Sequence, residues 1–251
     1  MQLAKVFSLD EKKNKKVRVV DYDKTSKPWP EWILLNNGRI GMAEVIIKEK
    51  KGARRVRYAR YVPEKLLVRV EVLPKTMEKF YDRFAKSYDT HVAQTNKPAA
   101  KFLADKISKL IPKDAKILDI GAGTGLLAEE LARKGFTNIT LTDFSKEMLA
   151  KAKKKKILKN CKFIRADFKK QILRGKYDIV ASVFSFSCAP YFLEEEMPQS
   201  IKKVKSLLKP KGYFAVFGHD YEYLIEKSFR KLAAGTKTLL GREHSWFIGR
   251  K

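Results

Sequence analysis

Residues 117 to 125 constrain the fold of this chain more than any other segment. They read Ile-Leu-Asp-Ile-Gly-Ala-Gly-Thr-Gly, and a helix-forming run begins directly afterwards at Leu126. An apolar strand that ends in a glycine-rich turn and continues into a helix is typical of an α/β unit. Glycines let the backbone turn tightly and let a ligand approach main-chain atoms that a Cβ would screen. The segment therefore predicts an α/β domain with a ligand site at this turn.

The rest of the chain after Pro112 alternates between apolar strand patterns and helical patterns. This alternation predicts a doubly wound, Rossmann-like α/β sheet of seven strands, with helices on both faces. Residues 236–251 are expected to supply a closing antiparallel pair. The domain is expected to cover 76–251, with leading helices over 76–111 that act as a lid. The other strands are expected at 117–120, 139–142, 162–165, 177–183 and 213–218.

Residues 1–75 show a different pattern, with short strand-like runs separated by turns. Asn36-Asn37-Gly38-Arg39 is a good hairpin signal between two such runs. The segment predicts a small basic β-rich domain, with a role in substrate recognition or an accessory role.

Net charge is the most unusual feature of the composition. The 251 residues include 55 Lys and Arg against 28 Asp and Glu, a formal net charge of +27. Such an excess favours a polyanionic partner, RNA before an anionic membrane surface, although a lysine-rich proteome would also produce it. Cations alternate with aromatic residues from 54 to 61, as in β-folds that bind single strands, but an ordinary strand fits this pattern too. The predicted RNA-contacting residues are Arg54, Arg55, Arg57 and Arg60.

Cysteine usage and hydropathy indicate a cytoplasmic protein. Cys161 and Cys188 lie in apolar stretches and are expected to be buried free thiols. No zinc-ligand spacing occurs, so no metal is expected. The longest uncharged run, 179–193, has 15 residues, whereas a membrane span needs about 20. No transmembrane segment is therefore expected.

Acidic residues at three successive strand ends indicate which ligand the glycine turn would bind. The Gly-x-Gly-x-Gly spacing differs from the dinucleotide fingerprint, and Asp119 would repel a pyrophosphate. It would attract the amino group and sulfonium of S-adenosylmethionine. Asp143 is placed to accept the ribose hydroxyls and Asp167 the adenine amino group, because ligands bind at the carboxyl ends of such strands. Phe144 and Phe168 are expected to flank the ring.

Residues 80–220 resemble the class I S-adenosylmethionine-dependent methyltransferases, and most of all the group that includes the ubiquinone and menaquinone C-methyltransferases. The resemblance rests on Tyr81-Asp82, Tyr88-Asp89, Asp167 and the runs 118–125, 142–149 and 208–213. It implies that both tyrosines cover the methionine end of the cofactor, that Gly121 binds the methionine portion and that Asp143 binds the ribose. Residues 169–171 depart from the family pattern. The predicted cofactor-binding residues are Tyr81, Tyr88, Asp119, Gly121, Ala122, Gly123, Gly125, Asp143, Phe144, Met148, Asp167, Phe168 and Ser182.

Methyl transfer from a sulfonium needs a base only when the acceptor holds a proton at neutral pH. His219 is the best-placed candidate base and His91 the second. The fourth strand lacks Asn/Asp-Pro-Pro-Tyr, which disfavours methylation of adenine or glutamine amines. Three functions remain open: a methyltransferase acting on RNA, one acting on a small molecule, and a non-catalytic cofactor-binding protein that serves as an RNA-binding protein or scaffold.

Overall fold

The computed structural model divides the chain into two compact units, Met1–Phe80 and Tyr81–Lys251. In the first unit the structure describes mainly the backbones of the strands. In the second unit it also describes most of the side chains. The described residues are 5–8, 17–22, 31–35, 40–49, 52–55, 67–72, 77–92, 94–186, 196–218 and 222–251.

The first unit contains a six-stranded sheet that closes on itself. Strand β1 pairs with β2, β2 with β3, β3 with β4 and β4 with β6, all antiparallel. Strand β6 then pairs with β1 in parallel, which completes a ring of five strands, and β5 forms a hairpin with β4. A closed sheet leaves few unpaired edges. The strands are β1 (Lys5–Ser8), β2 (Val17–Tyr22), β3 (Glu31–Leu35), β4 (Ile40–Glu49), β5 (Gly52–Arg55) and β6 (Leu67–Val72).

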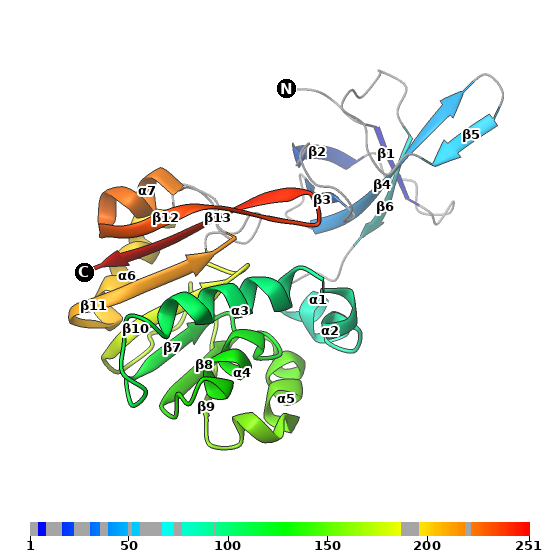
Figure 1. Ribbon diagram of the computed structural model, residues 1–251. Coiled ribbons are helices and arrows are strands. Elements are labelled where there is room, and N and C mark those ends of the chain that lie inside the picture. Colours follow the sequence, from blue (N-terminus) through cyan, green and yellow to red (C-terminus); the bar gives the residue numbers. More distant parts are fainter. Residues whose placement is uncertain are drawn as a thin grey trace. The chain divides into compact units, whose positions relative to one another are not determined.

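The second unit is built on a seven-stranded sheet in the order β12-β13-β11-β10-β7-β8-β9 (Figure 1). The five strands from β11 to β9 run parallel, whereas β13 is antiparallel to both of its neighbours. This confirms the doubly wound fold and its closing antiparallel pair. The strands are β7 (Ile117–Ile120), β8 (Ile139–Asp143), β9 (Lys162–Arg165), β10 (Tyr177–Val183), β11 (Leu208–Phe217), β12 (Arg230–Leu239) and β13 (Arg242–Arg250).

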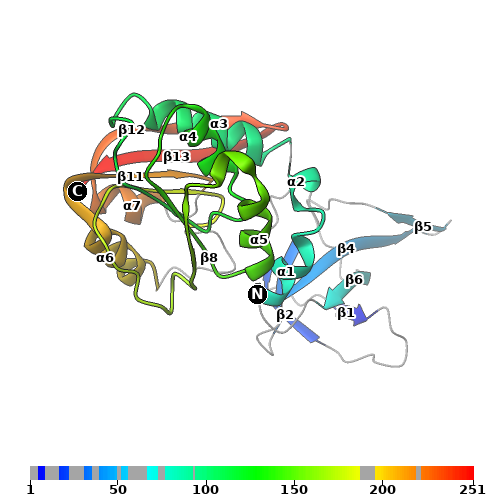
Figure 2. The same cartoon turned by 90° about the horizontal axis from the view of Figure 1, so that it is seen from below.

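Helices cover both faces of this sheet, α3 and α4 on one side and α6 and α7 on the other (Figures 1 and 2). The sheet therefore lies between two hydrophobic cores. Neighbouring residues of one strand point to opposite cores, as the pleat requires: Ile117 packs in the first and Leu118 in the second. The helices are α1 (Met77–Phe84), α2 (Tyr88–His91), α3 (Asn96–Ile107), α4 (Leu126–Arg133), α5 (Lys146–Lys154), the short 3-10 helix η2 (Lys156–Leu158), α6 (Met197–Leu207) and α7 (Glu222–Ser228).

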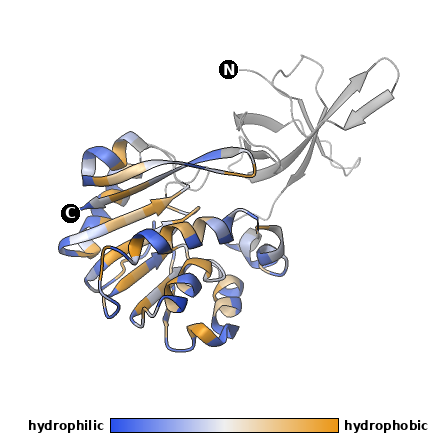
Figure 3. Ribbon diagram, viewed as in Figure 1, coloured by the Kyte–Doolittle hydropathy of each residue, from blue (hydrophilic) through white to orange (hydrophobic). Residues whose placement is uncertain are grey.

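The distribution of hydrophobic residues matches these layers. The central strands are hydrophobic, and the helices carry both hydrophobic and hydrophilic residues (Figure 3). In α3, the inward-facing residues Ala100, Leu103 and Ile107 are fully buried. Strand β11 begins at Leu208, earlier than the predicted 213, because Leu208 pairs with Tyr177 across an irregularity in the ladder. Over the described parts of the chain, no helix combines the length and apolar character of a membrane span.

Candidate cofactor site

The glycine turn after β7 adopts a backbone that other residues would strain. Gly121, Gly123 and Gly125 have φ angles of +63°, +56° and +80°, a region that residues with a Cβ seldom occupy. A Cβ on Gly121 would lie 1.7 Å from Ser185 Oγ, and one on Gly125 would lie 2.8 Å from a methyl carbon of Leu158. The first glycine therefore makes room for the segment that follows β10, and the last lets α4 begin close to its neighbours.

Asp143, the last residue of β8, connects the glycine turn to the turn after β8 through hydrogen bonds. Its Oδ2 accepts a hydrogen bond from the Gly123 N–H and its Oδ1 one from the Ser145 N–H, each 2.8 Å long. The side chain is almost wholly buried, and burial raises its pKa to about 6 although the two backbone hydrogen bonds oppose the shift. Each carboxylate oxygen has a second acceptor direction, so both can still accept a ligand hydroxyl.

Asp119 lies at the end of the neighbouring strand β7 and is 1% exposed. Burial, followed by the charge of Asp143, raises its pKa well above the ordinary value. Its Oδ2 is buried and has no hydrogen-bond partner among the described residues. A carboxylate in this state attracts a cationic or hydrogen-donating ligand group. It lines a pocket with Tyr88, Asn96, Gly121, Ala122, Leu126, Leu127 and Val183.

Two tyrosines from α1 and α2 lie beside the same turns. The Tyr81 ring meets the Phe144 ring edge-on, with 5.7 Å between centroids. Tyr88 lies against the glycine turn, since a Cβ on Gly123 would be 3.9 Å from its Cε1. Its hydroxyl accepts a hydrogen bond of 3.0 Å from Asn96 Nδ2, and burial raises its pKa. Tyr81 therefore lies beside Phe144, the residue after Asp143, and Tyr88 lies beside Gly123, which donates a hydrogen bond to Asp143.

Asp167 follows β9 and closes a local turn. Its Oδ1 accepts a hydrogen bond of 3.0 Å from the Lys169 N–H, while its own N–H donates to Gln171 Oε1. Its Oδ2 lies 3.5 Å from Lys170 Nζ, so all three residues that depart from the family pattern contact Asp167 directly. The predicted contact of Asp167 with adenine stays a prediction.

Three of the other predicted residues are fixed by contacts within the protein, Met148 and Phe168 by packing and Ser182 by hydrogen bonds. Met148 and Phe168 are 1% and 5% exposed, and the Phe168 ring meets the Phe186 ring edge-on within the second core. The Ser182 hydroxyl donates to the Ile120 carbonyl and accepts from the Phe186 N–H, both at 2.9 Å. The predicted contacts of these three residues with a cofactor remain predictions. Phe144 is partly buried, and its predicted contact also remains a prediction.

The predicted base and the predicted RNA contacts lie where side chains are not described. His219, Cys188, Arg57 and Arg60 fall outside the described residues, and His91, Arg54 and Arg55 are described only by their backbone. Cys161, by contrast, is a free, partly buried thiol whose pKa burial raises. Among the described residues, no group of His, Cys, Asp and Glu is arranged to hold a metal ion.

Several polar residues around the turns were not predicted from the sequence as parts of the site. Asn96 bonds to Tyr88, Thr124 to Asp89 and Ser145 to Asp82, while Ser185 packs against Gly121. Their partners are distant in sequence, up to 63 residues for Ser145 and Asp82. The repeated Tyr-Asp pair at 81–82 and 88–89 was the one available signal.

Comparison with known proteins identifies the second unit. Residues 117–212 match a family of methyltransferase domains. A malonyl-[acyl-carrier protein] O-methyltransferase of Bacillus cytotoxicus is 30% identical over 161 residues, which cover 62% of this chain and 54% of that protein. The human EEF1A lysine methyltransferase 2 is 33% identical over 119 residues, 42% of this chain and 48% of that protein. The chain thus spans about half the length of these relatives.

A solved structure shows the same fold. The N-methyltransferase NodS of Bradyrhizobium japonicum WM9, in complex with S-adenosyl-L-homocysteine, superposes with a TM-score of 0.58 at 12% identity, over 69% of this chain and 97% of that one. The narrower likeness to quinone C-methyltransferases stays a prediction. The domain family, the curated relatives and the order of strands agree that residues 117–212 form a methyltransferase domain, within a unit that has the fold of S-adenosylmethionine-dependent methyltransferases.

Proposed function

We propose that the protein transfers a methyl group from S-adenosylmethionine, bound at the carboxyl ends of β7 and β8, to an anionic acceptor. One observation carries the cofactor site: Asp119, whose buried Oδ2 has no hydrogen-bond partner among the described residues, lines a pocket together with Gly121 and Ala122 of the glycine turn. An ammonium group there would satisfy this oxygen and offset the burial of its charge. A pyrophosphate would be repelled by it.

The remaining roles follow from where the side chains lie. Asp143 keeps acceptor capacity for the ribose hydroxyls, and Gly121 gives the ligand access to the main chain. Tyr81 and Tyr88 would cover the methionine portion and exclude water. The bound cofactor supplies an activated methyl group, so the protein mainly aligns the acceptor with it, a contribution of roughly 7–11 kcal/mol in favourable cases.

Direct binding measurements test the cofactor site. We expect Asp119→Asn, which removes the charge and keeps the shape, to weaken S-adenosylmethionine binding by about 10- to 100-fold, the usual value of a charged hydrogen bond. Asp143→Ala should weaken binding at least as strongly. Calorimetric titration gives both constants, and unchanged binding by either variant would refute the role of that residue.

The proposal of an anionic acceptor is supported by the net charge of +27. RNA is the first candidate, from this charge and the Arg and Tyr pattern at 54–61. A carrier-bound or free small molecule is the second, favoured by the malonyl-[acyl-carrier protein] O-methyltransferase among the relatives. A cofactor-binding protein without catalysis is the third.

Labelled methyl groups distinguish these acceptors. Cell extract incubated with the protein and radiolabelled S-adenosylmethionine is fractionated after the reaction. Label in nuclease-sensitive material supports RNA, label in solvent-extractable material supports a small molecule, and label in protease-sensitive material supports a protein or a carrier-bound group. Cofactor binding without any transfer would favour the non-catalytic function.

A further inference from the structure

We propose that Asp82 and Asp89 are positioning residues that hold the α1–α2 segment, and with it Tyr81 and Tyr88, over the cofactor pocket. The inference rests on the proposed function, because the tyrosines matter only if the pocket binds S-adenosylmethionine. It arises from the repeated Tyr-Asp pair, in which each tyrosine is followed by an acid that bonds to a different turn of the site.

Asp89 bonds to the glycine turn. Its Oδ1 accepts a hydrogen bond from the hydroxyl of Thr124, which is fully buried between Gly123 and Gly125. Gly123 also donates its N–H to Asp143. Asp89 and Asp143 therefore bind neighbouring residues of the glycine turn, Thr124 and Gly123.

Asp82 bonds to the turn after β8. Its Oδ1 accepts hydrogen bonds from the Ser145 hydroxyl at 2.6 Å and from the Glu147 N–H at 3.2 Å. Ser145 caps α5 through a bond from the Met148 N–H and gives its own N–H to Asp143. Asp82 and Asp143 therefore both bind Ser145, in the turn after β8.

Asp82, Asp89 and Asp143 together connect the two turns both to each other and to the helices α1 and α2. Asp143 joins the turns at Gly123 and Ser145 from the side of the sheet. Asp89 and Asp82 join the same two turns to α2 and α1. Any movement of the helices away from the pocket must break these bonds, so the bonds couple the position of the tyrosines to the geometry of the cofactor turns.

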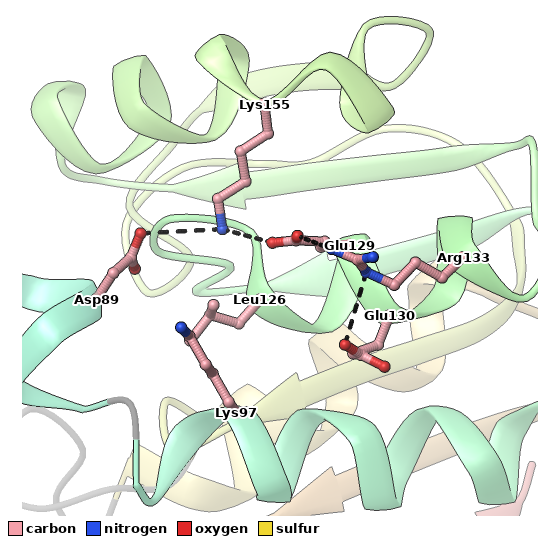
Figure 4. A pocket seen from close by; sticks show the side chains of 7 residues that line it. All are labelled: Asp89, Lys97, Leu126, Glu129, Glu130, Arg133 and Lys155. Carbon is pink, nitrogen blue, oxygen red and sulfur yellow. Dashed lines mark hydrogen bonds and ion pairs between the residues drawn. The ribbon is translucent and has the colours of Figure 1, made fainter.

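A charged network lies behind Asp89. Its Oδ2 is 4.0 Å from Lys155 Nζ, which donates to Glu129 Oε2 at 2.8 Å (Figure 4). These side chains line a surface pocket of about 320 Å³ with Lys97, Leu126, Glu130 and Arg133. The Asp89–Lys155 pair is long and partly exposed, with 31% and 20% of the side chains accessible, so it contributes little. The bond to Thr124 is therefore the main link.

Conservative and non-conservative variants of Asp89 separate its hydrogen bond with Thr124 from its ion pair with Lys155. Asp89→Ala removes both, whereas Asp89→Asn keeps an oxygen that can accept from Thr124 and loses only the charge. We expect Asp89→Ala to raise the dissociation constant of S-adenosylmethionine about tenfold and Asp89→Asn to stay within about threefold of the wild type. Thr124→Val removes only the hydroxyl and should match Asp89→Ala, and combining the two should add little further.

The same comparison applies to Asp82, with Asp82→Ala, Asp82→Asn and Ser145→Ala. Asp105→Asn is the matched control, since Asp105 also lies on a helix and pairs with Lys101 and Lys134 away from these turns. Calorimetric titration with S-adenosylmethionine gives the dissociation constants, and urea unfolding gives the stability of each variant. If Asp89→Ala does not fold, Thr124→Val supplies the deciding comparison.

Two results would overturn the inference. Equal dissociation constants for the wild type, Asp89→Ala and Thr124→Val, with loss of stability alone, would show that the acids only stabilise the fold and would leave the proposed function intact. A wild-type protein that binds no S-adenosylmethionine, together with an equally inactive Asp105→Asn control, would overturn the proposed function and the inference with it.

Discussion

Two carboxylates lie buried at the ends of adjacent parallel strands, and each raises the energy of the other. Burial and their mutual repulsion raise the pKa of Asp119, and burial raises that of Asp143 to about 6. Asp143 accepts two backbone hydrogen bonds, but Asp119 Oδ2 has no hydrogen-bond partner among the described residues, so the burial of Asp119 destabilises the ligand-free fold. Such groups are common where a protein binds a ligand of opposite charge.

Replacing Asp119 by asparagine should therefore have opposite effects on stability and on binding. The ligand-free variant loses a buried charge without changing shape, so we expect its melting temperature at pH 8 to rise by about 2–4 °C, the equivalent of about 1 kcal/mol. Binding of S-adenosylmethionine should weaken at the same time. Thermal unfolding with and without cofactor measures both, and a variant that melts lower and binds normally would contradict the prediction.

The pKa of Asp143 predicts a dependence on pH with a definite sign. Its ordinary value is 3.8 and its value in the fold is about 6, so between these pH values the folded protein holds a proton that the unfolded chain has released. The contribution of Asp143 to the stability of the ligand-free protein should fall as pH rises through this window, by at most about 3 kcal/mol, and stay level above it.

Cofactor affinity should change in the opposite direction, because the ionised carboxylate is the better acceptor. We expect the dissociation constant of S-adenosylmethionine to fall from about pH 5 to about pH 7 and then to level off. Urea unfolding and calorimetric titration across this range measure the two trends. Asp143→Asn is the control, and an equally steep pH profile in that variant would assign the effect to other groups.

At the scale of elements, the glycine turn sets how closely the segment after β10 approaches β7. Gly121→Ala meets a positive φ and a Cβ position 1.7 Å from Ser185 Oγ, whereas Gly135→Ala meets a positive φ of +87° and open space. We expect Gly135→Ala to cost about 1–2 kcal/mol of stability, the price of the backbone conformation alone. Gly121→Ala should cost more and should abolish cofactor binding.

A second substitution separates strain from collision in that experiment. Ser185→Gly removes the side chain that Gly121→Ala would strike, so the double variant should recover part of the stability lost by Gly121→Ala. Urea unfolding of the three variants and of Gly135→Ala provides the comparison. Equal losses for Gly121→Ala and Gly135→Ala would show that the segment after β10 adjusts without cost.

How much of this could be predicted from the sequence varies from element to element. Strands β7, β9 and β10 were predicted with their observed bounds, because each is a short apolar or alternating run next to a turn. Helix α2 was not separated from α1, since four residues carry no periodicity. The bonds of Asp82 and Asp89 were also out of reach, because they join residues 63 and 35 positions apart.

At the scale of the whole molecule, the excess of positive charge is shared by the segments before and after residue 76. If RNA is the partner, we expect affinity for a single-stranded RNA oligomer to fall at least tenfold between about 50 and 200 mM salt, because phosphate contacts release counterions. Fluorescence anisotropy measures this. A peptide nucleic acid of the same sequence lacks phosphates and should not bind, and a salt-independent affinity would argue against RNA.

The order of strands also governs when this sheet can form during synthesis. β13 (Arg242–Arg250) is inserted between β11 and β12 and bonds to both. A nascent chain that has not yet released residues 242–250 leaves two strands without their common neighbour, and their exposed backbone groups are open to wrong pairing. The complete seven-stranded sheet can therefore form only after residues 242–250 have left the ribosome.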